Sequence, residues 1–271
     1  MPKTWVRESS READAVLELG GLPPLPRTRL QTVEDLLEQS GRSAAPIRRA
    51  FVQSGRGASS GPGPLAAFAH AHDARALDAF LLLHAVASAE PWDCTYPSRV
   101  WVRALGLGKA AEKASAQAAV SKTMRRLAGR DLVRVSRAGR LSCVTLLHED
   151  GSGQPYTRPR TKEDPWFNVP YSYWSSGLSE RLTLAGKTMY LIAQTLAPSF
   201  YLPYGSAPAW YGVSPKTAQR GLAELLKAQL LTKEEKYEVN ISSETGWAVR
   251  TRYTWKSTPA EPPSPTIEGQ P

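Results

Sequence analysis

Apolar residues recur at broadly helical spacing in residues 74–89 and 182–197, which predicts a core-facing helix in each segment. A third segment, 214–231, has its apolar residues on one side and its Lys, Thr, Gln and Arg residues on the other. Ser214 is a favourable N-cap for this segment, and Pro215 fits the first helical position, where its missing N–H costs nothing. We therefore expect an amphipathic helix that begins at Pro215.

Two later regions have the pattern of β-hairpins. Residues 132–136 and 141–147 flank a tight turn, and residues 230–239 lead to 247–256 through a polar loop. In the last of these segments, apolar and basic residues alternate with a period of two. One face is expected to carry Trp247, Val249, Thr251, Tyr253 and Trp255, and the other Arg250, Arg252 and Lys256.

The predicted elements follow the same order twice: helix, short strand, helix, helix and two-stranded hairpin. The third helices of the two copies can be aligned without gaps by placing Leu132 on Leu230. Lys122 then falls on Arg220, and three pairs of apolar residues coincide, namely Val120 with Ala218, Met124 with Leu222 and Leu127 with Leu225. Because two unrelated helices would rarely agree in this way, we expect a repeated domain.

The other segments have the composition of an arm, a linker and a tail. The arm is rich in Pro, Gly, Ser and Arg, and we expect it to be partly disordered with one short helix, capped by Thr32 with Asp35 at the reciprocal position. The expected division is an N-terminal arm at 1–73, domain 1 at 74–150, a linker at 151–165, domain 2 at 166–258 and a disordered Pro-rich tail at 259–271.

Two stretches resemble parts of winged helix-turn-helix proteins. Residues 118–140, AAVSKTMRRLAGRDLVRVSRAGR, are similar to the recognition helix and wing of bacterial winged-helix regulators. Residues 182–196 and 214–233 are similar to the same domain in plasmid replication initiators and related actinobacterial proteins. The resemblance implies an α+β fold with two tandem winged-helix domains, each with three helices and a β-hairpin wing.

One segment departs from that family pattern. Residues 105–115, LGLGKAAEKAS, are longer than the usual turn between the second and third helices. This length affects the angle at which the first recognition helix would approach DNA.

Winged-helix proteins of this kind place the third helix in the major groove of DNA and the hairpin on its backbone. Arg and Lys side chains suit guanine, Gln suits adenine, and basic wing residues suit phosphates. The resemblance therefore implies DNA-binding residues Ser121, Lys122, Arg125, Arg126, Arg137 and Arg140 in domain 1, and Lys216, Thr217, Gln219, Arg220, Arg250 and Arg252 in domain 2.

Ordinary surface roles are alternatives for several of these residues. A charged helix face can simply be solvated, and so can the two arginines of the second wing. Arg126 could pair with Asp131, and Arg220 could pair with Glu224 one turn later. A surface pair of this kind contributes only ~0.3 to 0.5 kcal/mol.

Three further patterns have two interpretations each. Arg48 and Arg49 could form a minor-groove arm or an exposed linker. The aromatic segment 166–174 could stack on bases or belong to a core. The histidines at 70 and 72 match a metal-binding pattern of nicking enzymes, but they have neither a neighbouring strand nor a third ligand in the sequence.

Composition favours a polyanionic partner. The chain has 34 Lys and Arg against 25 Asp and Glu, a formal charge of +9. No apolar run approaches the ~18 to 20 residues needed to span a bilayer, and the N-terminus lacks a signal-peptide pattern. We therefore expect a cytoplasmic, nucleoid-associated protein without membrane contact. Cys94 and Cys143 have the spacing of neither a disulfide framework nor a zinc site.

These observations favour a sequence-specific protein that binds double-stranded DNA, most simply a bacterial transcriptional regulator. The alternatives are a replication initiator that binds the origin repeats of a plasmid or mobile element, and a protein-interaction scaffold. We expect no enzymatic activity, cofactor, metal or small-molecule ligand, because there is no phosphate-binding loop and His84 and His148 lack catalytic partners in the sequence. A homodimer also fits this hypothesis.

Overall fold

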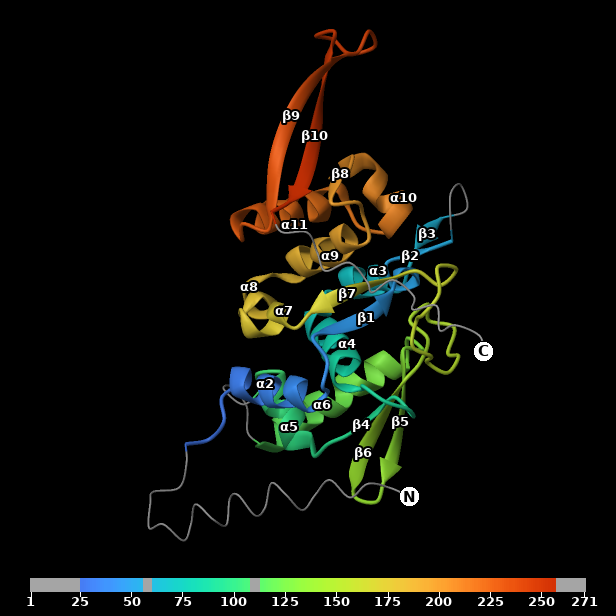
Figure 1. Cartoon of the computed structure of the whole chain (residues 1–271), viewed down its shortest axis with the longest axis vertical. Coiled ribbons are helices and arrows are strands. Elements are labelled where there is room, and N and C mark those ends of the chain that lie inside the picture. Colours follow the sequence, from blue (N-terminus) through green and yellow to red (C-terminus); the bar gives the residue numbers. More distant parts are fainter. Residues whose placement is uncertain (1–24, 56–59, 108–112, 257–271) are drawn as a thin grey trace, which may run out of the picture.

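The computed structural model describes residues 25–55, 60–107 and 113–256, which form a mixed α and β fold. Two halves with the same order of elements lie at opposite ends of the molecule, with a smaller set of elements between them (Figure 1). In the described part of the chain, no helix is long and apolar enough to cross a membrane.

The first half contains three helices and a three-stranded antiparallel sheet. The sheet has the order β4-β6-β5, so its last strand lies in the middle. The elements are α4 (Ala74–Val86), β4 (Asp93–Thr95), α5 (Ser98–Ala104), α6 (Lys113–Ala128), β5 (Val133–Ala138) and β6 (Leu141–Leu146).

The second half repeats this order and strand arrangement. Its sheet has the order β8-β10-β9, again with the last strand in the middle. A short 3₁₀ turn, η4 (Tyr204–Ser206), is added before its second helix. The other elements are α9 (Leu184–Gln194), β8 (Ser199–Tyr201), α10 (Ala207–Tyr211), α11 (Pro215–Lys227), β9 (Leu231–Val239) and β10 (Trp247–Trp255).

The backbone after the third helix is also the same in both halves. Asp131 and Gln229, which coincide in the alignment of Leu132 with Leu230, have positive φ angles of 55° and 59°. Leu132 then donates its backbone N–H to Leu127, and Leu230 donates its own to Leu225, at 3.2 and 3.0 Å. Each third helix therefore turns into its hairpin through the same local geometry.

The remaining elements join the halves. Strand β1 (Ala44–Arg48) pairs with β7 (Trp166–Pro170), and β1 packs against α4 near the middle of the molecule (Figure 1). Most of the buried hydrophobic residues form one cluster that includes both halves and these central elements. The other elements are α2 (Arg29–Gln39), η1 (Arg49–Phe51), β2 (Gln53–Ser54), β3 (Gly61–Pro62), α3 (Leu65–His70), α7 (Ser172–Ser175) and α8 (Leu178–Arg181).

The predicted cap of the N-terminal helix is wrong. Thr28 is the N-cap of α2, and Gln31 completes the reciprocal capping box. Thr32 lies inside the first turn, where its hydroxyl donates to the Thr28 carbonyl oxygen at 2.8 Å. The capping-box pattern cannot decide between the two threonines from the sequence, because each is followed three residues later by a side chain that could complete the box. Thr28 is followed by Gln31, and Thr32 by Asp35.

The aromatic segment 166–174 belongs to the core. Phe167, Tyr173 and Trp174 are all buried, and the Tyr173 ring stacks on Tyr190 of α9 with centroids 5.1 Å apart. Burial of these rings removes the faces that bases would need for stacking.

Arg48 is buried in a network of ion pairs and is neither a minor-groove arm nor an exposed linker residue. It is 1% exposed, and its guanidinium lies 2.7 Å from Glu149, which is fully buried, and 2.7 Å from Asp164. A third bond runs to the Thr157 hydroxyl at 2.9 Å. Burial tends to lower the pKa of Arg48, but the two carboxylates raise it overall. The network therefore attaches the segment after the first half to β1.

A second buried ion pair connects the opening helices of the two halves. Lys187 of α9 donates to both carboxylate oxygens of Asp78 of α4, at 2.6 and 2.7 Å. Lys187 is 5% exposed. The pair therefore holds α9 directly against α4.

Replacing Arg48 by Met would leave Glu149 buried without its counter-charge. We expect this variant to lose about 3 to 5 kcal/mol in the free energy of unfolding, measured by urea denaturation. The matched control is Arg134→Met at an exposed position of β5. A loss below about 1 kcal/mol, the size expected for an exposed ion pair, would contradict the structural role of Arg48.

His84 gives the fold a dependence on pH. It is 1% exposed, neither ring nitrogen has a hydrogen-bond partner among the described residues, and burial followed by the charges of Arg42 and Arg48 lowers its pKa to about 3. The unfolded chain binds a proton on this side chain below about pH 6.5, whereas the folded chain does not. Protonation therefore favours unfolding between these two pH values.

We expect the free energy of unfolding to fall by up to about 1.4 kcal/mol per pH unit between about pH 6.5 and 3 because of this histidine. The variant His84→Phe keeps a ring without titratable nitrogens and should show a shallower decline over that range. Urea denaturation at several pH values measures the difference, with His70→Gln as the control. Equal slopes for the wild type and His84→Phe would contradict the assignment.

Candidate nucleic-acid interface

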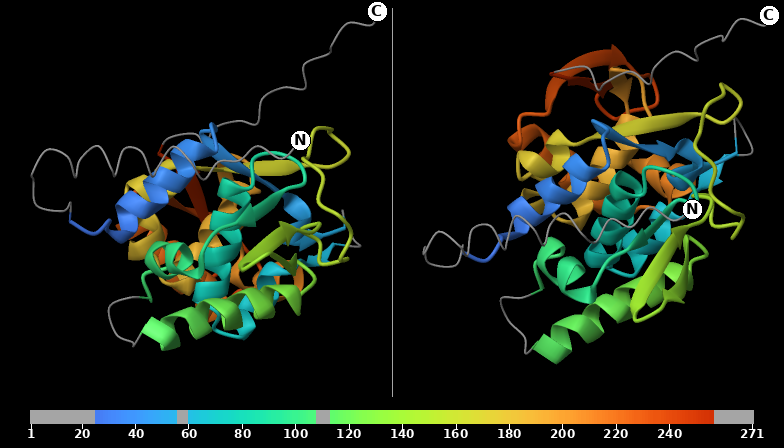
Figure 2. Two further views of the ribbon diagram at one scale, coloured as in Figure 1. Left: turned by 90° about the horizontal axis from the view of Figure 1, so that it is seen from below. Right: turned by 60° about the horizontal axis from the view of Figure 1, so that its bottom comes forward.

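Helix α6 lies at the periphery of the molecule (Figure 2). Val120, Met124 and Leu127 are buried on its inner side, whereas Lys122 and Arg125 are exposed on the other. In the described structure, neither Lys122 nor Arg125 has a hydrogen-bond or ion-pair partner. The exposed hydroxyl of Ser121 donates back to the Gln117 carbonyl oxygen at 3.2 Å. The face therefore offers two unpaired positive charges.

Helix α11 has the corresponding face in the second half. Ser214 caps the helix by accepting the Thr217 N–H at 3.1 Å, and Pro215 occupies the first helical position, as predicted. The Thr217 hydroxyl also bonds to the Ser214 hydroxyl at 2.9 Å, so Thr217 contributes to the cap. The remaining predicted residues, Lys216, Gln219 and Arg220, are exposed and have no partner in the described structure.

Each third helix is held against the start of the first helix of its half. In the first half, Arg126 makes two bonds to the carboxylate of Asp73, the N-cap of α4, at 2.8 and 2.9 Å. Arg130 makes a third bond to the same carboxylate at 3.0 Å. The alternative pairing of Arg126 with Asp131 is therefore wrong. Because Asp73 binds the Arg126 guanidinium, this residue is not one of the unpaired basic residues of the surface.

The second half makes the same connection with other residues. Glu224, which coincides with Arg126 in the alignment, accepts the backbone N–H of Thr183 at 2.9 Å and its hydroxyl at 2.5 Å. Thr183 is the N-cap of α9, as Asp73 is of α4. The alternative pairing of Glu224 with Arg220 is wrong because Thr183 occupies this carboxylate.

Close packing also fixes α11 on α9. Gly221 is buried, and a Cβ atom at this position would overlap the Ala185 carbonyl oxygen and the Met189 side chain. A side chain of any size would push the two helices apart.

The two hairpins differ in length and in the state of their basic residues. Arg137 and Arg140 lie at the short β5–β6 hairpin, exposed and without a partner in the described structure. In the longer β9–β10 hairpin, Arg250 lies 3.3 Å from Glu238, and Arg252 donates to the Tyr201 hydroxyl at 2.9 Å. The two arginines of the second hairpin are therefore already paired.

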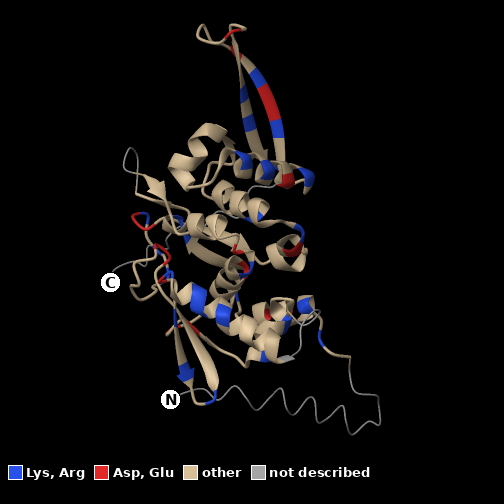
Figure 3. Ribbon diagram, turned by 180° about the vertical axis from the view of Figure 1, so that it is seen from behind, with Lys and Arg blue, Asp and Glu red and all other residues tan. Residues whose placement is uncertain are grey.

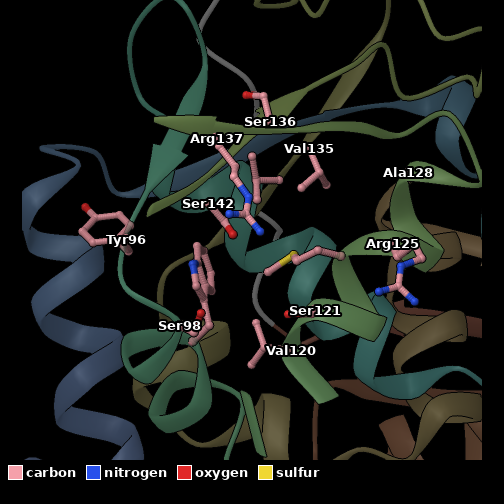
Figure 4. A pocket seen from close by; sticks show the side chains of 13 residues that line it. Tyr96, Ser98, Val120, Ser121, Arg125, Ala128, Val135, Ser136, Arg137 and Ser142 are labelled. Carbon is pink, nitrogen blue, oxygen red and sulfur yellow. The ribbon is translucent and has the colours of Figure 1, made fainter. Parts of the chain in front are cut away.

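A groove of about 440 Å³ separates α6 from the first hairpin. Figure 4 shows Arg125 and Arg137 on opposite sides of it. Buried Trp101, Met124 and Val144 supply apolar lining. Helix and hairpin thus form one continuous surface with basic residues on both sides of a shallow depression.

Comparisons with protein-family models, curated proteins and solved structures found no match for this chain. Among the residues that the structure describes, no group of three or more His, Cys, Asp or Glu side chains could hold a metal ion. His70 ends α3, and His72 lies in the following turn.

We expect Gly221→Ala to lower the free energy of unfolding by about 1 to 3 kcal/mol, since the added methyl group must displace α9 or α11. Gly129→Ala is the matched control, because a Cβ atom there would meet only ordinary contacts, the nearest at 3.5 Å. The control should be neutral or stabilising by up to about 1 kcal/mol. Thermal or urea denaturation of both variants tests this, and equal effects would contradict the close helix contact.

Proposed function

We propose that this chain is a tandem winged-helix protein that binds double-stranded DNA sequence-specifically and regulates transcription. In this proposal α6 and α11 are the recognition helices, and the hairpins that follow them are the wings. The observation that carries the proposal is the repeated element and strand order, with exposed, unpaired Lys122 and Arg220 at equivalent positions of the two third helices.

Charge placement supports this function. Seen from behind the view of Figure 1, both α6 and α11 carry basic residues (Figure 3). Each helix is held to the first helix of its half by Asp73 or Glu224, so its outer face has a fixed orientation. A fixed face allows side chains to select among base edges, because each hydrogen bond requires a defined direction.

The proposed contacts fall into two groups. Lys122, Arg125, Lys216, Gln219 and Arg220 would contact base edges and nearby phosphates, whereas Arg137 and Arg140 would contact the backbone beside α6. Ser121 and Thr217 lie beside these residues, but their hydroxyls also bond within the protein. Arg126, Arg250 and Arg252 are paired within the protein and would contribute to the orientation of the surface.

Selection from a random double-stranded DNA library at near-physiological salt tests the proposal. We expect enrichment of a motif with two unequal halves, because the outer faces of α6 and α11 differ in sequence. Strong binding without enrichment would instead indicate non-specific coating of DNA. Absence of binding would favour a protein-interaction scaffold.

The double variant Lys122→Ala/Arg220→Ala should bind the selected site at least about 30-fold more weakly, since each lost base contact costs about 1 to 3 kcal/mol. The control is Arg158→Ala/Arg160→Ala at two exposed positions between β6 and β7, which removes the same charge. Fluorescence anisotropy measures both affinities. A similar loss in both variants would show that net charge alone determines binding.

A further inference from the structure

The β9–β10 hairpin extends far beyond the body of the molecule (Figure 1). Strand β8 pairs with Arg252, Tyr253 and Thr254 of β10, and no other strand in the described part of the chain pairs with the outer part of the hairpin. This outer part holds five of the nine large hydrophobic residues that are exposed in the described chain, namely Tyr237, Val239, Ile241, Trp247 and Val249. Their exposed fractions lie between 53% and 94%.

Four of these side chains share one face of the hairpin. Tyr237 is directly opposite Val249, and Val239 is directly opposite Trp247. Because residues opposite each other in an antiparallel pair point to the same side, the two pairs form a continuous apolar patch. We call these four residues the apolar face. The buried ring of Tyr253 lies on the same side of β10, closer to the body.

The other surfaces of the hairpin are polar. The opposite face carries Glu238 and Arg250, which pair at 3.3 Å, and Lys236, which lies 3.7 Å from Glu234. These charges also follow the outer edge of β9. Charged residues on an edge strand disfavour the addition of another strand, so a partner would meet the apolar face more readily than the edge of β9. The edge of β10 that β8 leaves uncovered carries one charged residue, Arg250.

Charge indicates what kind of partner fits. Residues 231–255 contain four basic and four acidic side chains, whereas the whole chain has a formal charge of +9. A second copy of the chain would be repelled elsewhere but not at this neutral hairpin. DNA would gain little from these four side chains, because the nearest basic residue on the same side, Lys233, is already paired with Glu235.

We propose that the apolar face packs against the apolar face of a second copy, forming a homodimer of two stacked hairpins. Two sheets packed face to face bury the side chains between them at a spacing of about 10 Å. The packing would remove Tyr237 and Trp247 from water in both copies. The dimer does not depend on DNA, so it can be tested separately from the proposed function.

Analytical ultracentrifugation of the full chain without DNA, at concentrations up to about 100 µM, measures the association. We expect a concentration-dependent dimer for the wild type and at least a tenfold weaker dimer for Tyr237→Thr/Trp247→Thr. The control is Val135→Thr, which removes a 43% exposed valine from the other hairpin. Threonine suits a strand, so these substitutions leave the hairpin intact.

Cysteine cross-linking locates the contact. The two natural cysteines of the chain, Cys94 and Cys143, are buried, so an introduced thiol on the hairpin is readily distinguished from them. Under mild oxidation, Val249→Cys on the apolar face should form a disulfide-linked dimer, whereas Ala248→Cys on the opposite face should not.

A monomeric wild type at all concentrations would overturn the proposal, as would equal cross-linking at positions 248 and 249. If the chain were monomeric and Tyr237→Thr/Trp247→Thr weakened DNA binding, the apolar face would be a DNA contact instead. Loss of DNA binding by Lys122→Ala/Arg220→Ala with an unchanged dimer would leave this inference standing.

Discussion

The guanidinium of Arg48 is the charge on which the relation between the two halves depends. A buried cation is tolerated only when its counter-charges and hydrogen bonds are in place, and here Glu149, Asp164 and Thr157 supply them. Arg48 ends β1, and the three partners lie in the segment that leaves the first half and leads to β7. The network therefore closes this segment onto the central β1–β7 sheet, against which α4 lies.

The two halves preserve a connection while changing its chemistry. Asp73 with Arg126 and Thr183 with Glu224 occupy equivalent places, yet the carboxylate belongs to the first helix in one half and to the third helix in the other. The donor is a guanidinium in the first half and a threonine hydroxyl and backbone N–H in the second. In both cases the third helix is held to the first turn of the first helix. The geometry is thus retained through the position of the bond and not through the identity of the residues, which explains why a comparison of residue types alone shows little similarity there.

Local patterns in the sequence predict local geometry. The cap and start of α11, the buried sides of α6 and α11 and the alternation in β10 all follow from spacing and turn chemistry. Partners far apart in the chain are not visible in such patterns: Arg48 with Glu149, Arg126 with Asp73, and β1 with β7. The alternation in β10 also does not show how many of its residues pair with β8. The exposure of Trp247, which lies beyond the residues paired with β8, could therefore not be predicted. The exposure of the unpaired basic residues on α6 and α11 therefore follows from helical spacing, whereas the partner of Arg126 does not.

The central sheet has a consequence for any ligand that touches both ends of the molecule. Domains on a flexible tether adapt to a range of spacings, because the tether absorbs the difference. Here β1–β7 and the Asp78–Lys187 pair leave no such tether between the halves. If the proposed function holds, the fixed distance between the halves would require a fixed helical spacing between the two half-sites of the DNA. Inserting half a helical turn, about 5 base pairs, would rotate one half-site to the far side of the duplex.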